Sequence, residues 1–253
     1  ETENSFLFSL HEMYYYVWPE KKSYCFEKAV TAQREKFEAY CQRFPEYPAE
    51  YEAMKRLAIY TLWSGTVKPR DFIQRDTVFV TKNFGCLAWG YENYACGWGL
   101  CEADPQLAYN QIMTLLDHQN ELGGIPHSFG DSVVNFEAQM APSAGFMLTR
   151  MLEKMTITDG QAEELYEKLS RHTNYYLNYM DVNQDGLPEY FHGNDACYDG
   201  AAMFIPSITV TSPDLATFLI FQMDLLADLA IRLNRLDSSR IWKERSDEML
   251  EKM

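Results

Sequence analysis

Apolar residues recur every three or four positions over eight stretches of the chain, and this repeat constrains the fold more than any other feature. Prolines and capping residues separate the stretches. Pro45 ends the first, for example, and Asp104 followed by Pro105 begins the fourth. We expect a helix within each of these ranges, roughly 22–44, 49–63, 84–101, 104–121, 142–155, 158–180, 212–233 and 238–253. Because the main strand signal is the short β-prone run 77–81, the sequence predicts an all-α protein.

Successive helices are joined by alternately short and long connections. Helix pairs of this kind build a bundle, an α-solenoid or a closed α/α toroid. The chain shows no 34-residue repeat, which argues against a tetratricopeptide solenoid. Residues 1–20 alternate weakly and carry an aromatic cluster that Pro19 ends. We therefore expect residues 1–21 to form an extended lead-in or linker, followed by a helical domain over 22–253.

Charge and aromatic content limit the classes of binding partner that we expect. The net charge of −15 repels phosphate backbones and anionic membranes, so we expect neither nucleic-acid nor membrane binding. Aromatic residues make up 15% of the chain, more than a core alone requires. Tyrosine and tryptophan combine flat apolar faces with polar edges, which suits the binding of sugar rings.

The six cysteines have no CxxC spacing, and thiols without disulfides are the simplest interpretation. No apolar run approaches the length of a membrane-spanning helix. We expect a soluble protein and slightly favour the cytoplasm. The chain does not begin with Met, so a processed or trimmed N-terminus would hide a signal peptide.

A loop over 181–199, DVNQDGLPEYFHGNDACYD, combines five carboxylates with turn-forming residues. Neither helical nor strand periodicity is visible there, and its aromatic residues argue against disorder. A long ordered loop between strong helices usually carries a site.

The first half of this loop has the spacing of a calcium-binding loop. Its D-x-N-x-D-G pattern places alternate oxygens around one point, and glycine permits the sharp turn. The twelfth position is His192 instead of a bidentate Glu, so the loop is not an EF-hand. The expected Ca²⁺ ligands are Asp181, Asn183, Asp185, the Leu187 carbonyl and Glu189. The alternative is a turn in which these acids only accept hydrogen bonds from the backbone.

The last residue of the loop, Asp199, is flanked by Tyr198 and by small apolar residues. Such surroundings raise the pKa of a carboxyl group, as a general acid working near neutral pH requires. A helix cap or a paired surface acid is the alternative. Asp195 is expected to be better hydrated and structural.

Taken together, the motifs D-x-N-x-D-G-L-P-E-Y and H-G-N-D-A-C-Y-D resemble the glycosidases with an (α/α)6 barrel. The closest resemblance is to glycoside hydrolase family 63, which includes processing α-glucosidases and mannosylglycerate hydrolases; trehalases are more distant. The resemblance implies that Asp199 is the general acid, and in several members the same loop binds Ca²⁺. It covers roughly residues 50–240 and extends to the DPQLA, QNELGGIPH, QMAP and SPDLA segments.

The resemblance implies that several side chains line the sugar site. They are Trp89, Tyr91, Glu92, Gln119, His127, Gln139 and Tyr198. The family has a Trp-Asp pair at the cleavage point. Here Gly90 follows Trp89, and a different register places Glu92 at the acidic position as a longer substitute.

The second catalytic carboxylate is not evident. Inversion requires a base about 6.5–9.5 Å from the acid, and in the family this base is a Glu near an aromatic- and Arg-rich turn. Residues 200–253 contain no such turn, and a ring of twelve helices needs more chain than this. We expect an incomplete (α/α)6 toroid of helical hairpins, a piece of a longer enzyme.

We therefore expect an inverting glycoside hydrolase that cleaves α-linked glucosides or mannosides. The first alternative is a carbohydrate-binding or scaffold domain without catalysis, which the missing carboxylate favours. The second is a helical interaction domain with a Ca²⁺ loop, which would bind proteins and no sugar.

Overall fold

The computed structural model of the protein describes residues 25–80, 86–197 and 201–253. The chain divides into two compact units, Glu1–Ala39 and Tyr40–Met253. Helix α1 (Phe26–Cys41) supplies most of the described part of the first unit and contains no buried residue. The extended lead-in expected over 1–21 lies outside the described residues.

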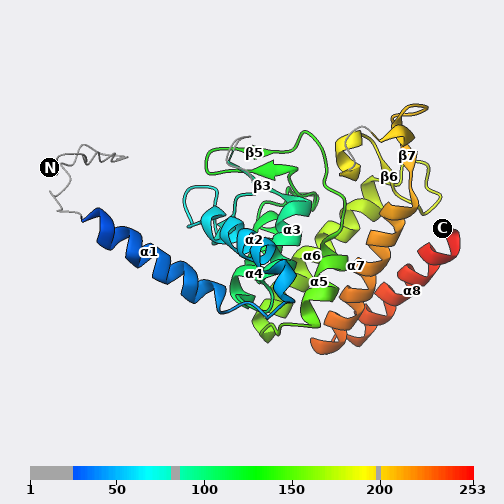
Figure 1. Ribbon diagram of the computed structural model, residues 1–253. Coiled ribbons are helices and arrows are strands. Elements are labelled where there is room, and N and C mark those ends of the chain that lie inside the picture. The colour runs from blue at the N-terminus through cyan, green and yellow to red at the C-terminus, as the bar shows by residue number, and fades with distance from the viewer. Residues whose placement is uncertain (1–24, 81–85, 198–200) are drawn as a thin grey trace. The chain divides into compact units, whose positions relative to one another are not determined.

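The second unit is mainly helical, so the all-α expectation is confirmed (Figure 1). Together with α1, its helices account for all eight predicted helical stretches. The helices are α2 (Glu52–Gly65), α3 (Gly90–Leu100), α4 (Pro105–Leu116), α5 (Ala144–Leu152), α6 (Asp159–Tyr179), α7 (Pro213–Arg232) and α8 (Leu236–Lys252). None of the described helices is both long and apolar enough to span a bilayer.

Several of the predicted helix ends are confirmed by their hydrogen bonds. The Asp104 carboxylate accepts from the backbone N–H of Leu107, with Pro105 in the first turn of α4. At the start of α6, Thr158 and Gln161 form a reciprocal capping box, in which each side chain accepts from the other residue's backbone N–H. These bonds satisfy backbone donors that the first turn of a helix leaves without partners.

Several predicted boundaries are wrong by a few residues, among them those of α4, α5 and α8. Helix α4 ends at Leu116 instead of near 121, because the chain turns at once and Asn120 donates its backbone N–H to the Gly124 carbonyl. Helix α5 begins at Ala144, two residues after Pro142. Helix α8 begins at Leu236, so Ser238 lies inside its first turn instead of capping it.

The strands are short and pair antiparallel. Strands β1 (Thr66–Val67) and β2 (Thr77–Val78) form one ribbon, which confirms the start of the predicted 77–81 run. Strands β3 (Ala88–Trp89), β4 (Ser128–Phe129) and β5 (Val134–Asn135) form a three-stranded sheet. The loop expected over 181–199 contains a strand after all: β6 (Glu189–Tyr190) pairs with β7 (Val210–Thr211). Sequence periodicity could not reveal a two-residue strand whose partner lies twenty residues away.

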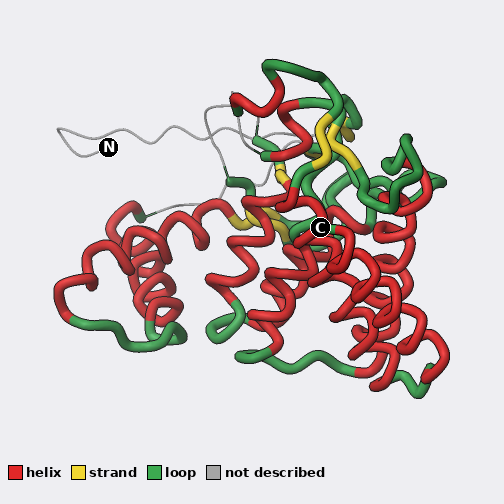
Figure 2. The backbone as a smooth tube through the Cα atoms, turned by 90° about the vertical axis from the view of Figure 1, so that its right-hand side faces the viewer, coloured by secondary structure: helices red, strands yellow, loops and turns green. Residues whose placement is uncertain are grey.

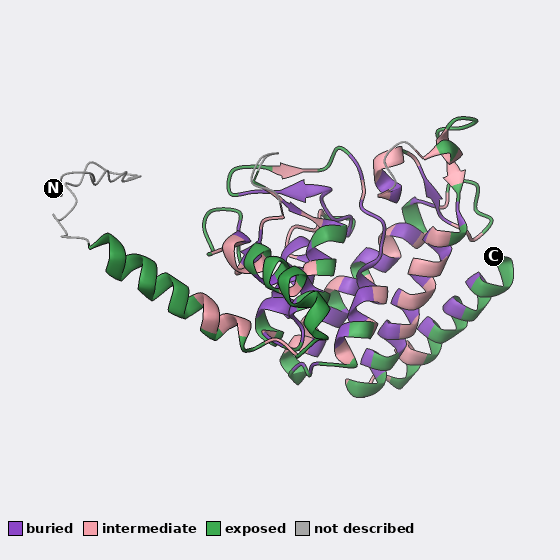
Figure 3. Ribbon diagram, viewed as in Figure 1, coloured by how far each residue is buried: buried purple, intermediate pink, exposed green. Residues whose placement is uncertain are grey.

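The core lies between helices α3 to α7. Helix α4 buries ten consecutive residues, and α7 buries residues on several sides along its length (Figure 3). Helix α8 packs antiparallel on α7 and buries Trp242, whose indole N–H donates to the Tyr166 hydroxyl at 3.2 Å. The opposite face of α8 is exposed (Figure 3).

Most of the loops and short strands lie at one end of these helices. The chain enters α3, α5 and α7 at this end and leaves α4 and α6 there, so their connections meet. Figures 1 and 2 show the β3–β5 and β6–β7 sheets beyond the helix ends on this side. Side chains from segments far apart in the sequence are therefore brought together at this end.

Candidate functional site

The short β3–β4 pairing brings Trp89 and His127 together. Trp89 lies opposite Ser128 in the antiparallel register, and His127 immediately precedes β4. The two rings meet edge to face with centroids 4.9 Å apart. His127 is held by its own backbone N–H, which donates to the Asn135 carbonyl on β5 at 2.8 Å. The sheet thus fixes an aromatic face beside a buried imidazole.

A buried amide fixes the backbone at Trp89. The Asn93 Oδ1 atom accepts from the Trp89 N–H at 2.8 Å, while Asn93 Nδ2 donates to the Val78 carbonyl and to Gln111 Oε1, both at 2.9 Å. Asn93 and Gln111 are fully buried. Since each buried amide has its partners, the network can hold the start of α3 rigidly.

The segment at Gln139 and Met140 closes the site on a second side. Met140 lies against Gly90, where an added Cβ would come within 2.9 Å of its side chain. Gln139 Oε1 lies beside Gly124, at 3.1 Å from the position of an added Cβ. The Tyr176 hydroxyl donates to the Met140 carbonyl at 2.7 Å. The absence of a side chain at both glycines thus lets this segment approach the start of α3 and the loop before His127 closely.

Asp195 anchors the same segment from the loop that follows β6. One carboxylate oxygen accepts from the Gln139 N–H at 2.8 Å, and the other accepts from the N–H groups of Phe191 and His192 at 3.0 and 2.9 Å. Its structural role is confirmed, but the expectation of a hydrated side chain was wrong, since Asp195 is 3% exposed. Burial, with the nearby Asp195 carboxylate, raises the pKa of Tyr175.

Several polar atoms in this part of the structure are buried without a hydrogen-bond partner among the described residues. They include His127 Nδ1, which lies 3.9 Å from a Glu137 carboxylate oxygen, and Gln139 Oε1, as well as Ser128 Oγ and Gln119 Oε1. Leaving such groups without partners costs about 1–3 kcal/mol each. A ligand that offers hydroxyl groups can satisfy the His127 and Gln139 atoms, and the adjacent Trp89 ring offers an apolar face. The arrangement suits a polyhydroxylated, ring-shaped ligand.

The other predicted sugar-site residues lie in different surroundings. Gln119 donates through Nε2 to the Gly123 and Lys168 carbonyls, which ties the loop to α6; no described contact joins it to Trp89. Tyr91 and Glu92 lie on the first turn of α3, next to Trp89 in sequence, and both are exposed. Tyr198 and Asp199 lie outside the described residues. The structure thus brings Trp89 and His127 into ring contact and places Gln139 beside Gly124, three residues before His127.

The predicted calcium loop forms a compact turn. The two Asp181 oxygens accept from the N–H groups of Asp185 and Gly186, and Asp185 in turn accepts from Leu187. Glu189 is buried, and its carboxylate accepts from the Val182 N–H at 2.9 Å.

Among the described residues, no three His, Cys, Asp or Glu side chains form a metal-binding group. Gly186 has a φ of +91°, as the sharp turn requires. The oxygen-only donor set suits a hard cation such as Ca²⁺, and cation binding stays a prediction.

Sequence reasoning missed some of the residues that hold the site. Neither Tyr176, which holds the Met140 carbonyl, nor Asn93 was among the predicted site residues. An asparagine or aspartate within an otherwise apolar segment is a usable signal, because a buried polar side chain requires partners. Its partners cannot be read from the sequence, since Asn93 contacts Val78 and Gln111 from two other elements.

Comparison with known proteins supports the fold. The sequence matches no protein-family model, and it matches none of the curated proteins. The structure is similar to glycoside hydrolase family 63 (GH63) mannosylglycerate hydrolase from Thermus thermophilus in complex with glucose, with a TM-score of 0.61 and 16% identity. That alignment covers 77% of this chain and 62% of the hydrolase chain.

Two further solved structures show the same similarity. The same hydrolase in complex with Tris and D-glycerate aligns with a TM-score of 0.60 and 14% identity, over 77% of this chain and 63% of that one. A conserved protein from Thermus thermophilus aligns with a TM-score of 0.60 and 16% identity, over 77% of this chain and 61% of that one. The chain has a GH63-like fold, and it spans between 61% and 63% of the length of these neighbours.

Proposed function

We propose that the chain is part of a glycoside hydrolase that cleaves α-linked glucosides or mannosides with inversion. The observation that carries the proposal is the contact between the Trp89 and His127 rings, together with buried polar atoms of His127 and Gln139 that lack partners among the described residues. The GH63-like fold supports it, since the neighbours with that fold include a mannosylglycerate hydrolase.

In this proposal the helices belong to an (α/α)6 toroid, of which the chain supplies part. The irregular end of the helices corresponds to the open face of the ring. Trp89 offers its ring face to the sugar, and His127 and Gln139 bind hydroxyl groups. Gln119 holds the loop, while Tyr91 and Glu92 lie at the edge of the site. Tyr198 adds a second aromatic face next to the acid.

Asp199 is the proposed general acid. It would protonate the oxygen of the leaving group, while a carboxylate on the opposite face activates water. The identity of that base is left open. Asp195, four residues earlier in the chain, holds the loop after β6 to Gln139, because three backbone N–H groups converge on its buried carboxylate.

We also propose that Ca²⁺ binds Asp181, Asn183, Asp185, the Leu187 carbonyl and Glu189. The ion would fix the shape of the loop and contribute no chemical step. The observation in favour is that several side-chain oxygen atoms, which could act as metal ligands, lie close together around the turn at Gly186.

The test is hydrolysis of aryl α-glucosides, aryl α-mannosides and mannosylglycerate by the full-length protein. Activity should fall by about 10³-fold or more in Asp199→Asn, and Trp89→Ala should raise KM, since it removes an aromatic face from the site. Unchanged activity in Asp199→Asn would show that the acid is assigned wrongly. Proton NMR of the product anomer tests inversion.

A second candidate is a carbohydrate-binding domain without catalysis. It is favoured by residues 200–253, which show no acid on an aromatic- and Arg-rich turn. Calorimetry distinguishes the two. This candidate predicts that sugar binds and that Trp89→Ala weakens the binding, with no turnover by the full-length protein.

A further inference from the structure

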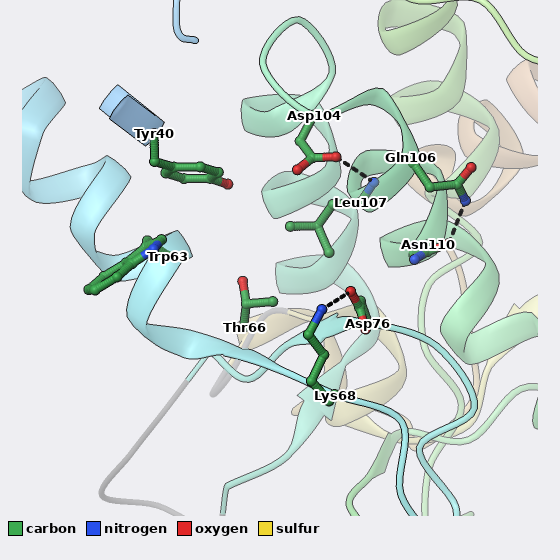
Figure 4. A pocket seen from close by; sticks show the side chains of 9 residues that line it. All are labelled: Tyr40, Trp63, Thr66, Lys68, Asp76, Asp104, Gln106, Leu107 and Asn110. Carbon is green, nitrogen blue, oxygen red and sulfur yellow. Dashed lines mark hydrogen bonds and ion pairs between the residues drawn. The ribbon is translucent and has the colours of Figure 1, made fainter. Parts of the chain in front are cut away.

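A cavity of about 360 Å³ lies apart from the candidate site, between α2 and the first half of α4 (Figure 4). Its volume is within the range of roughly 300–1,000 Å³ that is usual for small-molecule sites. The lining residues are Tyr40, Trp63, Thr66, Lys68, Asp76, Asp104, Gln106, Leu107 and Asn110. None of them belongs to the site around Trp89 and His127.

The charges around this cavity balance. The Lys68 ammonium pairs with Asp76 at 2.6 Å, and the Arg43 guanidinium pairs with Asp104 at 3.1 Å. The two carboxylates thus face two cations. An ionic ligand would have to compete with these pairs, so the cavity favours a neutral ligand.

The cavity also offers neutral hydrogen-bonding groups. Asn110 accepts from Gln106 Nε2 through its Oδ1 at 2.9 Å, and its Nδ2 group points toward the cavity in Figure 4. Thr66 donates to the Leu62 carbonyl and keeps its oxygen as an acceptor. Amides and hydroxyls of this kind bind the alternating donors and acceptors of a polyol.

One hydroxyl group in the cavity lacks a partner. The Tyr40 Oη atom is buried and has no hydrogen-bond partner among the described residues, and in Figure 4 it points toward Asp104 and Leu107. Burial, followed by the charge of Asp104, raises the pKa of Tyr40 to about 12. The group therefore stays protonated and can donate to a ligand.

Aromatic and apolar surface completes the lining. Trp63 lies on α2, and the Tyr40 ring is packed on one side by Phe44 edge to face and by the Arg43 guanidinium. Leu107 faces these rings from α4 (Figure 4). Aromatic faces beside amides and a hydroxyl donor match the two kinds of surface on a sugar ring.

We propose that this cavity binds the ring of a neutral hexose, as a second saccharide site outside the candidate active site. Tyr40 donates to a sugar hydroxyl, Asn110 binds a second one, and Trp63 contacts the apolar face of the ring. The proposal does not rest on the proposed hydrolysis, since the two sites share no residue.

The test is a titration of the ¹⁵N-labelled full chain with D-glucose at millimolar concentrations, followed by amide shifts. Saturable shifts are expected at Lys68, Leu107 and Asn110. In Tyr40→Phe their midpoint should rise about tenfold, which corresponds to about 1.4 kcal/mol. Tyr40→Phe should not lower the melting temperature, because the hydroxyl makes no hydrogen bond within the described protein. Asn110→Leu, which replaces the amide of the lining with an apolar group of similar shape, should abolish the shifts.

Two controls separate this site from the other. Tyr51→Phe removes the hydroxyl of an exposed tyrosine and should leave the titration unchanged. His127→Ala should also leave the shifts at Lys68 and Asn110 unchanged, whatever it does to turnover. The proposal is overturned if these amides do not shift, if Tyr40→Phe and Asn110→Leu titrate like the wild type, or if glucose 6-phosphate saturates the site more tightly than glucose.

Discussion

The Asp195 carboxylate accepts a hydrogen bond from the backbone N–H of Gln139 at 2.8 Å, across 56 positions of sequence. The same carboxylate binds two N–H groups of its own loop, at Phe191 and His192. One buried side chain therefore fixes the loop after β6 to the segment that carries a predicted sugar-site residue. A change at Asp195 should affect both segments.

We expect Asp195→Asn to lower the free energy of unfolding by about 2–4 kcal/mol. The amide places an NH₂ group against backbone donors, and buried N–H groups lose their charged acceptor. Chemical denaturation measures the change. Asp237→Asn, at a side chain that is 96% exposed, is the control and should stay within about 0.5 kcal/mol of the wild type. Equal stability of the two variants would contradict the anchoring role.

The contact between α5 and α7 requires a glycine. An added Cβ at Gly145 would lie 2.4 Å from the Cα atom of Gln222, which is backbone and cannot rotate away. Gly145→Ala should therefore destabilise the protein by about 3 kcal/mol or more.

Gly160, in the first turn of α6, is the matched control. An added Cβ there meets nothing nearer than the Thr158 hydroxyl at 4.0 Å, so Gly160→Ala should stabilise the protein by up to about 1 kcal/mol. Melting curves of both variants test the pair. A mild effect at Gly145 would show that the two helices can separate at little cost.

His172 should make the protein sensitive to acid. It is fully buried, and burial lowers its pKa from 6.5 to about 3. Between about pH 3 and pH 6.5, His172 therefore binds a proton more readily in the unfolded chain than in the folded protein. Stability from this group is complete above about pH 6.5 and is lost as the pH falls toward 3, by roughly 1.4 kcal/mol per pH unit.

The measurement is the free energy of unfolding of wild type and His172→Leu between pH 7 and pH 4. The variant should lose less stability on acidification than the wild type. His192→Gln, at an exposed histidine, should keep the wild-type slope. Parallel curves for wild type and His172→Leu would mean that His172 does not titrate between the two states.

A buried acid at the end of α4, Asp117, joins the segment before β2 to α6. Asp117 accepts from Arg75 Nε at 2.5 Å and from Arg75 Nη2 at 3.0 Å, and it also binds Lys168. Burial opposes ionisation, but these hydrogen bonds outweigh it and lower the pKa of Asp117.

Asp117→Asn should cost about 3–5 kcal/mol, because it leaves Arg75 and Lys168 without their shared charge. Urea denaturation compares this variant with Asp224→Asn. Asp224 forms an exposed pair with Lys243, so its loss should cost at most about 1 kcal/mol. Similar costs at the two positions would argue against a special role for the buried network.

Calcium should stabilise the loop over 181–190. A chelator, or Asn183→Ala, should increase hydrogen exchange in this loop before it affects the distant helices, since a bound ion stabilises only the folded turn. Metal content and melting temperature check the result. If a chelator changed neither, the acids would serve only the turn that their backbone hydrogen bonds already form.

The sequence alone determined the helices. Apolar spacing over 159–179 and 213–232, with caps at Thr158 and Asp104, identified these elements because both signals are local to one stretch of chain. The family resemblance also pointed to Trp89 and His127. It could not show that their rings meet, nor that Gln119 turns its amide to α6 instead.

Only the tertiary structure decided how the candidate site is held and where a second cavity lies. Asp195 was expected to be hydrated, yet it is buried because the segments at 139 and 191–192 converge on it. The pairing of β6 with β7 and the cavity beside Tyr40 depend in the same way on residues far apart in the chain. Local periodicity carries no record of such partners, because packing between elements, and not propensity within them, brings the residues together.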